Sequence, residues 1–109
     1  MMPKMRLRVL SQELIVLNLE AFTATEFNLA YHLLCAANAC GVALNDPELL
    51  AEIERIAEEQ QAGIDAKHPR YEHSSGSAAT RNLPGIFHTL ALEARAKILT
   101  IKSGTYQKS

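Results

Sequence analysis

The clearest structural boundary in this chain is the segment Phe22-Thr23-Ala24-Thr25-Glu26-Phe27. A threonine followed three residues later by a glutamate is the pattern of a capping box. In that arrangement the Thr23 hydroxyl accepts a hydrogen bond from the Glu26 amide, and the Glu26 carboxylate accepts one from the Thr23 amide. Phe22 and Phe27 stand where the two halves of a hydrophobic staple are expected. The segment therefore predicts a helix that begins after Thr23.

Two helices follow from the spacing of the apolar residues beyond this boundary. The first is predicted to end at Gly41, and a second is predicted over residues 46–61, because Asp46 can cap a helix and Pro47 suits its first position. The expected core residues of the first helix are Phe27, Ala30, Tyr31, Leu34 and Ala37, and those of the second are Leu49, Leu50, Ile53, Ile56 and Ala57.

The N-terminal residues show the patterns of strands. Residues 5–10 alternate between apolar and basic side chains, which is the period of a half-buried strand, and residues 14–19 are apolar and partly β-branched. The alternative for residues 11–22 is a helix with Ser11 as its cap.

The second half of the chain predicts a loop, a helix and a hairpin. Helical periodicity is lost over residues 62–80, which predicts a long loop. It returns over residues 82–97, which predicts a third helix, with Pro84 tolerable only in its first turn. Residues 98–107 are predicted to be two short strands around Ser103-Gly104. The predicted fold class is α+β and mostly helical. It is a single domain over residues 1–109 with an N-terminal strand pair, three helices and a C-terminal hairpin.

Composition fits a globular protein. The chain has 109 residues, 48% of them hydrophobic and 21% charged, and no tryptophan. Its most apolar stretch, Leu29 to Leu44, contains His32 and Asn38 and is predicted to be too short and too polar to span a bilayer. Cys35 and Cys40 lie five residues apart on one predicted helix and so point to different sides, which predicts two reduced thiols and a cytoplasmic protein.

Charge is distributed unevenly along the chain. Residues 1–10 hold three basic residues and no acid, residues 11–65 hold ten acids against a single base, and residues 66–109 hold seven bases against two acids. This polarity indicates a charged partner.

Two places in the sequence resemble the winged-helix DNA-binding domain of the OmpR-type response regulators. The segment 22–29, followed by Leu33-Leu34, is similar to the Leu-Thr-x-x-Glu-Phe-x-Leu-Leu entry of that family into its first helix, and residues 101–106 are similar to its wing. The Asp46-Pro47-Glu48-Leu49-Leu50 segment fits the start of the family's second helix. The resemblance implies a winged-helix regulator that binds duplex DNA with residues 82–97 as recognition helix and residues 99–107 as wing.

The resemblance also implies which residues contact DNA. His88 or Thr89 is expected to reach a base edge, and the expected phosphate contacts are Arg81, Arg95, Lys97, Lys102 and Lys108. This basic face is thinner than that of the family, because Leu92, Glu93 and Ala96 lie among these cations.

The alternative is a protein-interaction module, for example an inhibitor that docks on a host protein complex. Its expected binding residues are Glu52, Glu58 and Glu59 on the acidic helix, which can also mimic a nucleic acid, and Leu92. No catalytic motif, phosphate loop or zinc-ligand spacing is present, so we expect neither an enzyme, nor a metal or cofactor, nor a small-molecule substrate.

Overall fold

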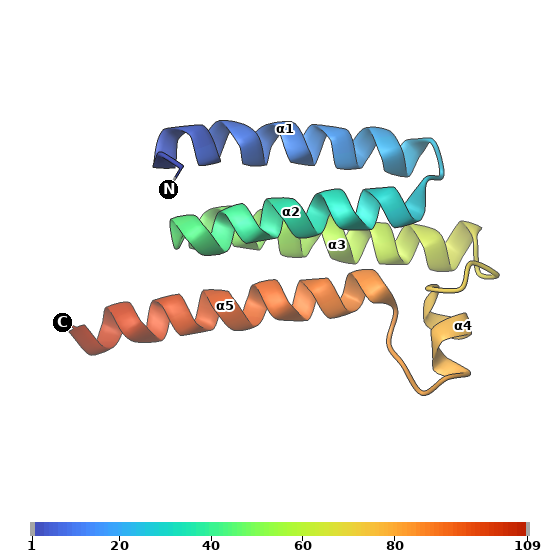
Figure 1. Ribbon diagram of the computed structural model, residues 1–109. Helices are drawn as coiled ribbons and strands as arrows, with labels where there is room; N and C mark the ends of the chain where they lie inside the picture. Colours follow the sequence, from blue (N-terminus) through green and yellow to red (C-terminus); the bar gives the residue numbers. More distant parts are fainter. Residues whose placement is uncertain (1, 109) are drawn as a thin grey trace.

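The computed structural model describes residues 2–108, with side chains as far as Gly104, and within that range helices are its only regular secondary structure. Its elements are α1 (Lys4–Thr23), α2 (Phe27–Leu44), α3 (Pro47–Lys67), α4 (Ser75–Ala79) and α5 (Ile86–Lys108). Figure 1 shows the four long helices running in alternating directions, with α1 along one edge, α5 along the opposite edge, and α2 and α3 between them. The predicted α+β winged-helix fold is therefore wrong, and so are its strand pair and hairpin.

Helix α1 replaces the predicted strand pair. It begins at Lys4, so the alternative of a helix capped by Ser11 identified the right type of element but not its start. Ser11 is instead buried inside the helix, and its hydroxyl donates to the Arg8 carbonyl at 2.7 Å. The alternation at residues 5–10 misled the prediction because α1 has apolar residues on two opposite faces. Only one of these faces, which contains Ile15 and Ala21, is buried against the bundle.

The predicted capping box is the turn between α1 and α2. Thr23 is the last residue of α1, and its hydroxyl donates backwards to the Leu19 carbonyl at 2.9 Å. Helix α2 follows Glu26, whose side chain makes no capping hydrogen bond, and Thr25 turns the chain with a φ of 61°. The predicted contact between the two phenylalanines is present, because the Phe22 and Phe27 ring centroids lie 5.2 Å apart.

Helix α2 does not stop at Gly41. It continues to Leu44 and ends at Asn45, which adopts the left-handed conformation with a φ of 49°. Gly41 is required for packing, because a Cβ at this position would lie 2.7 Å from Leu50 Cδ2 of α3. The glycine thus permits the close approach of α2 and α3 near their shared turn.

The start of α3 is confirmed. Asp46 Oδ1 accepts hydrogen bonds from the backbone N–H groups of Glu48 and Leu49, both at 3.1 Å, and Pro47 occupies the first helical position. The buried stripe contains the predicted residues Leu50, Ile53, Ile56 and Ala57, whereas Leu49 is only partly buried. The helix runs beyond residue 61 as far as Lys67.

The segment from residue 62 to the C-terminus is more helical than predicted. Residues 62–67 belong to α3, and α4 interrupts the remainder of the predicted loop. Pro84 precedes α5, which begins at Ile86 and continues to Lys108 through the region of the predicted hairpin. Ile98 is buried, which explains why the helix continues past the expected end at residue 97.

The interior combines aliphatic packing with one buried amide pair. Helix α1 packs mainly on α2, and α5 mainly on α3. Between α1 and α3, the Gln60 amide donates to Asn18 Oδ1 at 2.7 Å, and the Asn18 amide donates to Gln60 Oε1 at 3.1 Å and to the Ala30 carbonyl of α2 at 2.7 Å. These buried hydrogen bonds fix the position of α1 relative to α2 and α3.

Helix α2 is long and apolar enough to cross a membrane by length and composition alone. This is weak evidence, because the core helix of a folded bundle passes the same test. In this fold Ala30, Leu34 and Ala37 of α2 are fully buried among the neighbouring helices. Cys35 and Cys40 on the same helix are free thiols, as predicted.

Candidate functional site

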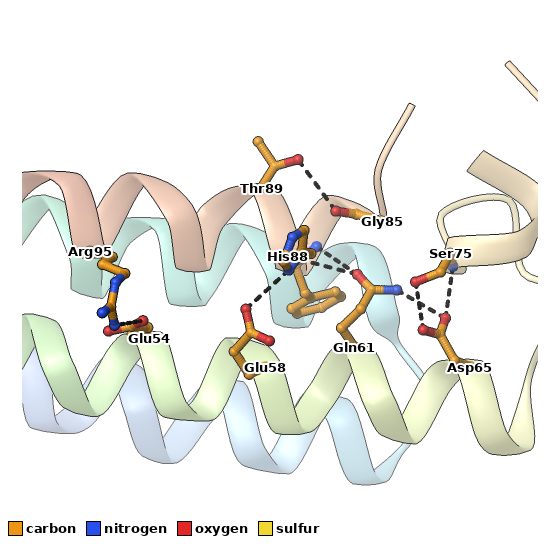
Figure 2. Close-up of polar contacts among 10 residues, drawn as sticks. Glu54, Glu58, Gln61, Asp65, Ser75, Gly85, His88, Thr89 and Arg95 are labelled. Atoms are coloured by element: carbon orange, nitrogen blue, oxygen red, sulfur yellow. Dashed lines mark hydrogen bonds and ion pairs between the residues drawn. The ribbon is translucent and has the colours of Figure 1, made fainter. Parts of the chain in front are cut away.

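Three of the residues predicted to bind DNA, His88, Thr89 and Arg95, lie on α5, and two of them face α3 (Figure 2). Arg95 forms an ion pair with Glu54 at 3.2 Å, and His88 Nδ1 lies 3.1 Å from a Glu58 carboxylate oxygen. The Thr89 hydroxyl donates to the carbonyl of Gly85, just before α5, at 3.3 Å. These groups are therefore engaged within the protein.

The other predicted DNA contacts do not form one face. The Arg81 guanidinium donates to the Glu72 carbonyl at 2.6 Å, in the segment between α3 and α5. Lys97 is half-buried, Lys102 is exposed, and the side chain of Lys108 lies outside the described residues. Phosphate binding requires cations on one accessible surface, and here the acidic side of α3 lies beside α5.

The acidic residues predicted for protein binding are partly neutralised. Glu58 faces His88, and Glu59 forms an ion pair with Arg55 one turn away at 3.0 Å. Glu52 is exposed and has no hydrogen bond or ion pair to the described part of the chain. Leu92 is 51% exposed on α5, between His88 and Arg95, whose acidic partners Glu58 and Glu54 are on α3.

Gln61, which the sequence analysis did not identify, organises the start of α5. Its side-chain oxygen accepts from the backbone N–H groups of Phe87 at 3.0 Å and His88 at 3.3 Å, and its amide nitrogen donates to Asp65 Oδ1 at 3.1 Å (Figure 2). Gly85 leaves room for this side chain, since a Cβ there would lie 2.3 Å from it. Gln61 of α3 thus caps the start of α5. This part of the contact between α3 and α5 therefore has a structural role.

The titratable groups with shifted pKa values also have structural partners. Burial alone would raise the pKa of Asp65, but the backbone N–H and hydroxyl of Ser75 hold it below its usual value. Burial and the hydrogen bond with Cys35 raise the pKa of Tyr31 to about 12, and burial raises the pKa of the Cys35 thiol. Tyr31 and Cys35 are therefore protonated at neutral pH and are not activated nucleophiles. Within the described residues, no group of three or more histidine, cysteine or acidic side chains is arranged to hold a metal ion.

An open pocket of about 610 Å³ lies where the chain leaves α3. It is lined by Phe27, Lys67, His68, Pro69, Arg70 and Tyr71. Its rings already contact one another, because Phe27 lies 5.0 Å from His68 and 5.2 Å from Tyr71 between centroids. The Tyr71 hydroxyl also donates to Asn28 Oδ1. We therefore interpret this pocket as the place where the segment after α3 packs on α2.

The most exposed apolar surface of the described chain lies on α1. Five residues recur along it at alternating spacings of four and three, and they define what we call the outer α1 face: Met5, Val9, Gln12, Val16 and Leu19. Met5 is 79% exposed, Val16 60% and Leu19 48%, whereas Gln12 is the single polar member. The face lies opposite the buried residues of α1 and points away from the bundle.

Helix α1 thus has apolar residues on both its covered and its exposed side, with the polar Ser11 and Asn18 among the covered ones. Two shallow hollows of about 400 and 440 Å³ lie along its exposed side, and both are bordered by Val16. This surface was not predicted from the sequence, because residues 5–10 and 14–19 have the patterns of strands. The alternating three-and-four spacing, which is typical of a helix that pairs with another helix, is the signal that could have revealed it.

No protein-family model, curated protein or solved structure matches this chain.

Proposed function

We propose that this protein is a helical protein-interaction module that docks on its partner through the outer α1 face. The observation that carries the proposal is the row of exposed apolar residues on this face, from Met5 to Leu19. Isolated apolar residues are ordinary on protein surfaces, but a row of exposed apolar residues along one helix face, interrupted here by Gln12, is typical of a surface that another molecule covers.

Energetics favour this surface over the acidic side of α3. Complete burial of a fully exposed Val, Leu or Met side chain contributes about 1.5–3 kcal/mol, and each apolar residue of the outer α1 face, from 40% to 79% exposed, contributes a part of this against the cost of association. An exposed ion pair contributes about 0–1 kcal/mol, and Glu58 and Glu59 already have partners in this chain. Apolar docking is therefore the stronger source of binding energy.

The same geometry supports a protein partner more than duplex DNA. Arg95, His88 and Arg81 are engaged by acidic side chains or by a backbone carbonyl, and the hairpin expected to act as the wing is helix. The two free cysteines are compatible with action in the reducing cytoplasm, which remains our proposal for its location.

Substitution of the exposed apolar residues tests the proposal. Val16→Glu places a charge in the centre of the face, and Leu92→Glu is a matched control, since Leu92 is similarly exposed on α5. Tagged protein is used to capture partners from the source cells, and each captured protein is identified, purified and titrated. We expect Val16→Glu to weaken binding by at least about tenfold and Leu92→Glu to leave it unchanged. Loss with Leu92→Glu alone would move the docking surface to α5 and overturn the proposal.

Gel-shift titration at low salt tests the DNA alternative. If Arg95→Ala and Lys102→Ala weaken a salt-dependent shift while Val16→Glu does not, duplex DNA is the partner and the proposal is wrong.

A further inference from the structure

We infer that the molecule covering the outer α1 face is a second copy of this chain, with the two α1 helices antiparallel about a two-fold axis. This inference rests on the proposed function, because it names the partner of the same surface. It is carried by the spacing of the face, by the order of charges along α1 and by the position of α1 in the bundle.

The spacing fits a helix pair. Val9 and Val16 occupy the first position of a seven-residue repeat, and Met5, Gln12 and Leu19 occupy the fourth. In an antiparallel pair, first-position residues pack against fourth-position residues of the other helix. One register pairs Met5 with Val16 and Val9 with Gln12, each contact formed twice, and places Leu19 at either end of the pair.

The order of charges along α1 selects the antiparallel direction. Its N-terminal half carries Lys4, Arg6 and Arg8, and its C-terminal half carries Glu13 and Glu20. A parallel pair would bring the two basic halves together, whereas an antiparallel pair brings each basic half to an acidic one and also opposes the helix dipoles.

One charge pair fixes the register in this arrangement. Arg6 and Glu13 occupy the same flanking position of successive repeats, next to the apolar row. In the antiparallel register described above, Arg6 of one copy lies about two residues along the axis from Glu13 of the other, or about 3 Å. Both side chains are exposed and lack an ion pair within the described residues. Arg8, in contrast, forms an ion pair at 2.7 Å with Asp46, the N-cap residue of α3.

The fold leaves this face accessible. Helix α1 lies along one edge of the molecule (Figure 1), and the outer face is opposite the side that packs on α2. Two copies can therefore meet through α1 with their bundles on opposite sides of the pair. A helix of 20 residues is about 30 Å long, which makes this a small interface, so we expect a dimer that dissociates on dilution.

Sedimentation equilibrium over a wide range of concentration tests the association. We expect a reversible monomer–dimer equilibrium that Val16→Glu shifts to monomer, while Leu92→Glu leaves it unchanged. The circular dichroism spectrum and melting temperature of each variant are compared with those of the parent chain. Met5→Glu serves as a second variant should Val16→Glu unfold, since Met5 is the most exposed residue of the face.

A charge exchange tests the direction and register. Arg6→Glu and Glu13→Arg, each alone, should weaken the dimer by about tenfold, because each creates two repulsive pairs. The combined variant Arg6→Glu/Glu13→Arg should restore the original affinity. Failure of the combined variant to recover would overturn the antiparallel register.

Thiol cross-linking gives an independent measure of direction. A mixture of Met5→Cys and Val16→Cys proteins should cross-link through a short bis-maleimide more efficiently than either variant alone, with the parent chain and its own two thiols as background. Efficient cross-linking of Met5→Cys with itself would show a parallel pair and overturn the inference.

The outcomes separate the inference from the proposed function. A chain that stays monomeric at all concentrations, while Val16→Glu still abolishes binding to a purified different protein, would overturn the inference and leave the proposed function standing. A dimer insensitive to Val16→Glu would overturn the inference alone, whereas binding partners that all tolerate Val16→Glu would overturn both.

Discussion

The two edge helices of the bundle are held in different ways. Helix α5 is joined to α3 by the Gln61 cap at its start and by two ion pairs further along, so its polar groups are satisfied within the chain. Helix α1 is joined to α3 by the buried Asn18–Gln60 pair and by Arg8–Asp46, while its outward side presents exposed apolar residues.

This difference indicates where the chain is open to a partner. On α5, residues that were predicted to bind DNA, such as His88 and Arg95, instead contact acidic side chains of α3. On α1 the interior contacts involve one side only, and nothing in the described chain covers the other. The following predictions test whether the two edges are held as described.

The largest effect is expected at the buried amide pair. Asn18→Leu should destabilise the fold by about 3 kcal/mol, because it leaves the Gln60 amide buried without its partner. The measurement is the free energy of unfolding from urea denaturation. The double variant Asn18→Leu/Gln60→Leu removes both polar groups and should recover much of the loss. Additive destabilisation in the double variant would contradict the pairing.

A smaller loss is expected at the cap of α5. Gln61→Ala should cost about 2 kcal/mol, since two backbone N–H groups lose their acceptor. Gly85→Ala should act through the same contact, because its Cβ displaces the Gln61 side chain. The two substitutions together should therefore cost less than the sum of their separate effects in a double-mutant cycle. Glu59→Ala, a neighbouring exposed substitution, is the control and should change stability by less than about 0.5 kcal/mol.

The cap of α3 predicts a pH dependence. Asp46→Ala should cost about 1 kcal/mol near neutral pH. The Leu49 backbone N–H, together with Arg8, lowers the pKa of Asp46 below its usual value of about 3.9. Its contribution is therefore complete above that value and is lost as the pH falls through the lower pKa of the folded state. Urea denaturation at several pH values should show the parent and Asp46→Ala proteins converging in acid, whereas a constant difference would contradict this role.

The smallest effect is expected at Thr23. A capping box would make Thr23→Ala cost about 1 kcal/mol. The structure instead places this exposed hydroxyl on the Leu19 carbonyl at the end of α1, so the expected change is below about 0.5 kcal/mol. A decrease of about 1 kcal/mol or more in the free energy of unfolding, measured by urea denaturation, would support the capping box and contradict the observed turn.

Local chemistry made part of the fold predictable from the sequence. The start of α3 depends on Asp46 and Pro47 acting on the next few residues, and a contact of this range can be read directly from the chain. The core stripe of α3 and the free cysteines were also predictable, since both follow from spacing on one helix.

Contacts distant in the sequence decided the rest. Residues 5–19 suit either a strand or a helix by their side chains, and packing against α2, with Asn18 bonded to Ala30 and Gln60, makes them helical. The threonine–glutamate pattern at residues 23–26 marks a real boundary, but Thr23 ends α1 instead of capping the next helix, and α2 begins only at Phe27.

The candidate site was hidden for the same reason. Val16 and Ile15 are both β-branched and adjacent in the chain, and only the assembled bundle buries Ile15 and leaves Val16 exposed. The sequence determined that this segment is apolar. Which of its residues remain free for a partner was decided by the tertiary structure, because exposure depends on which face of α1 the other helices cover.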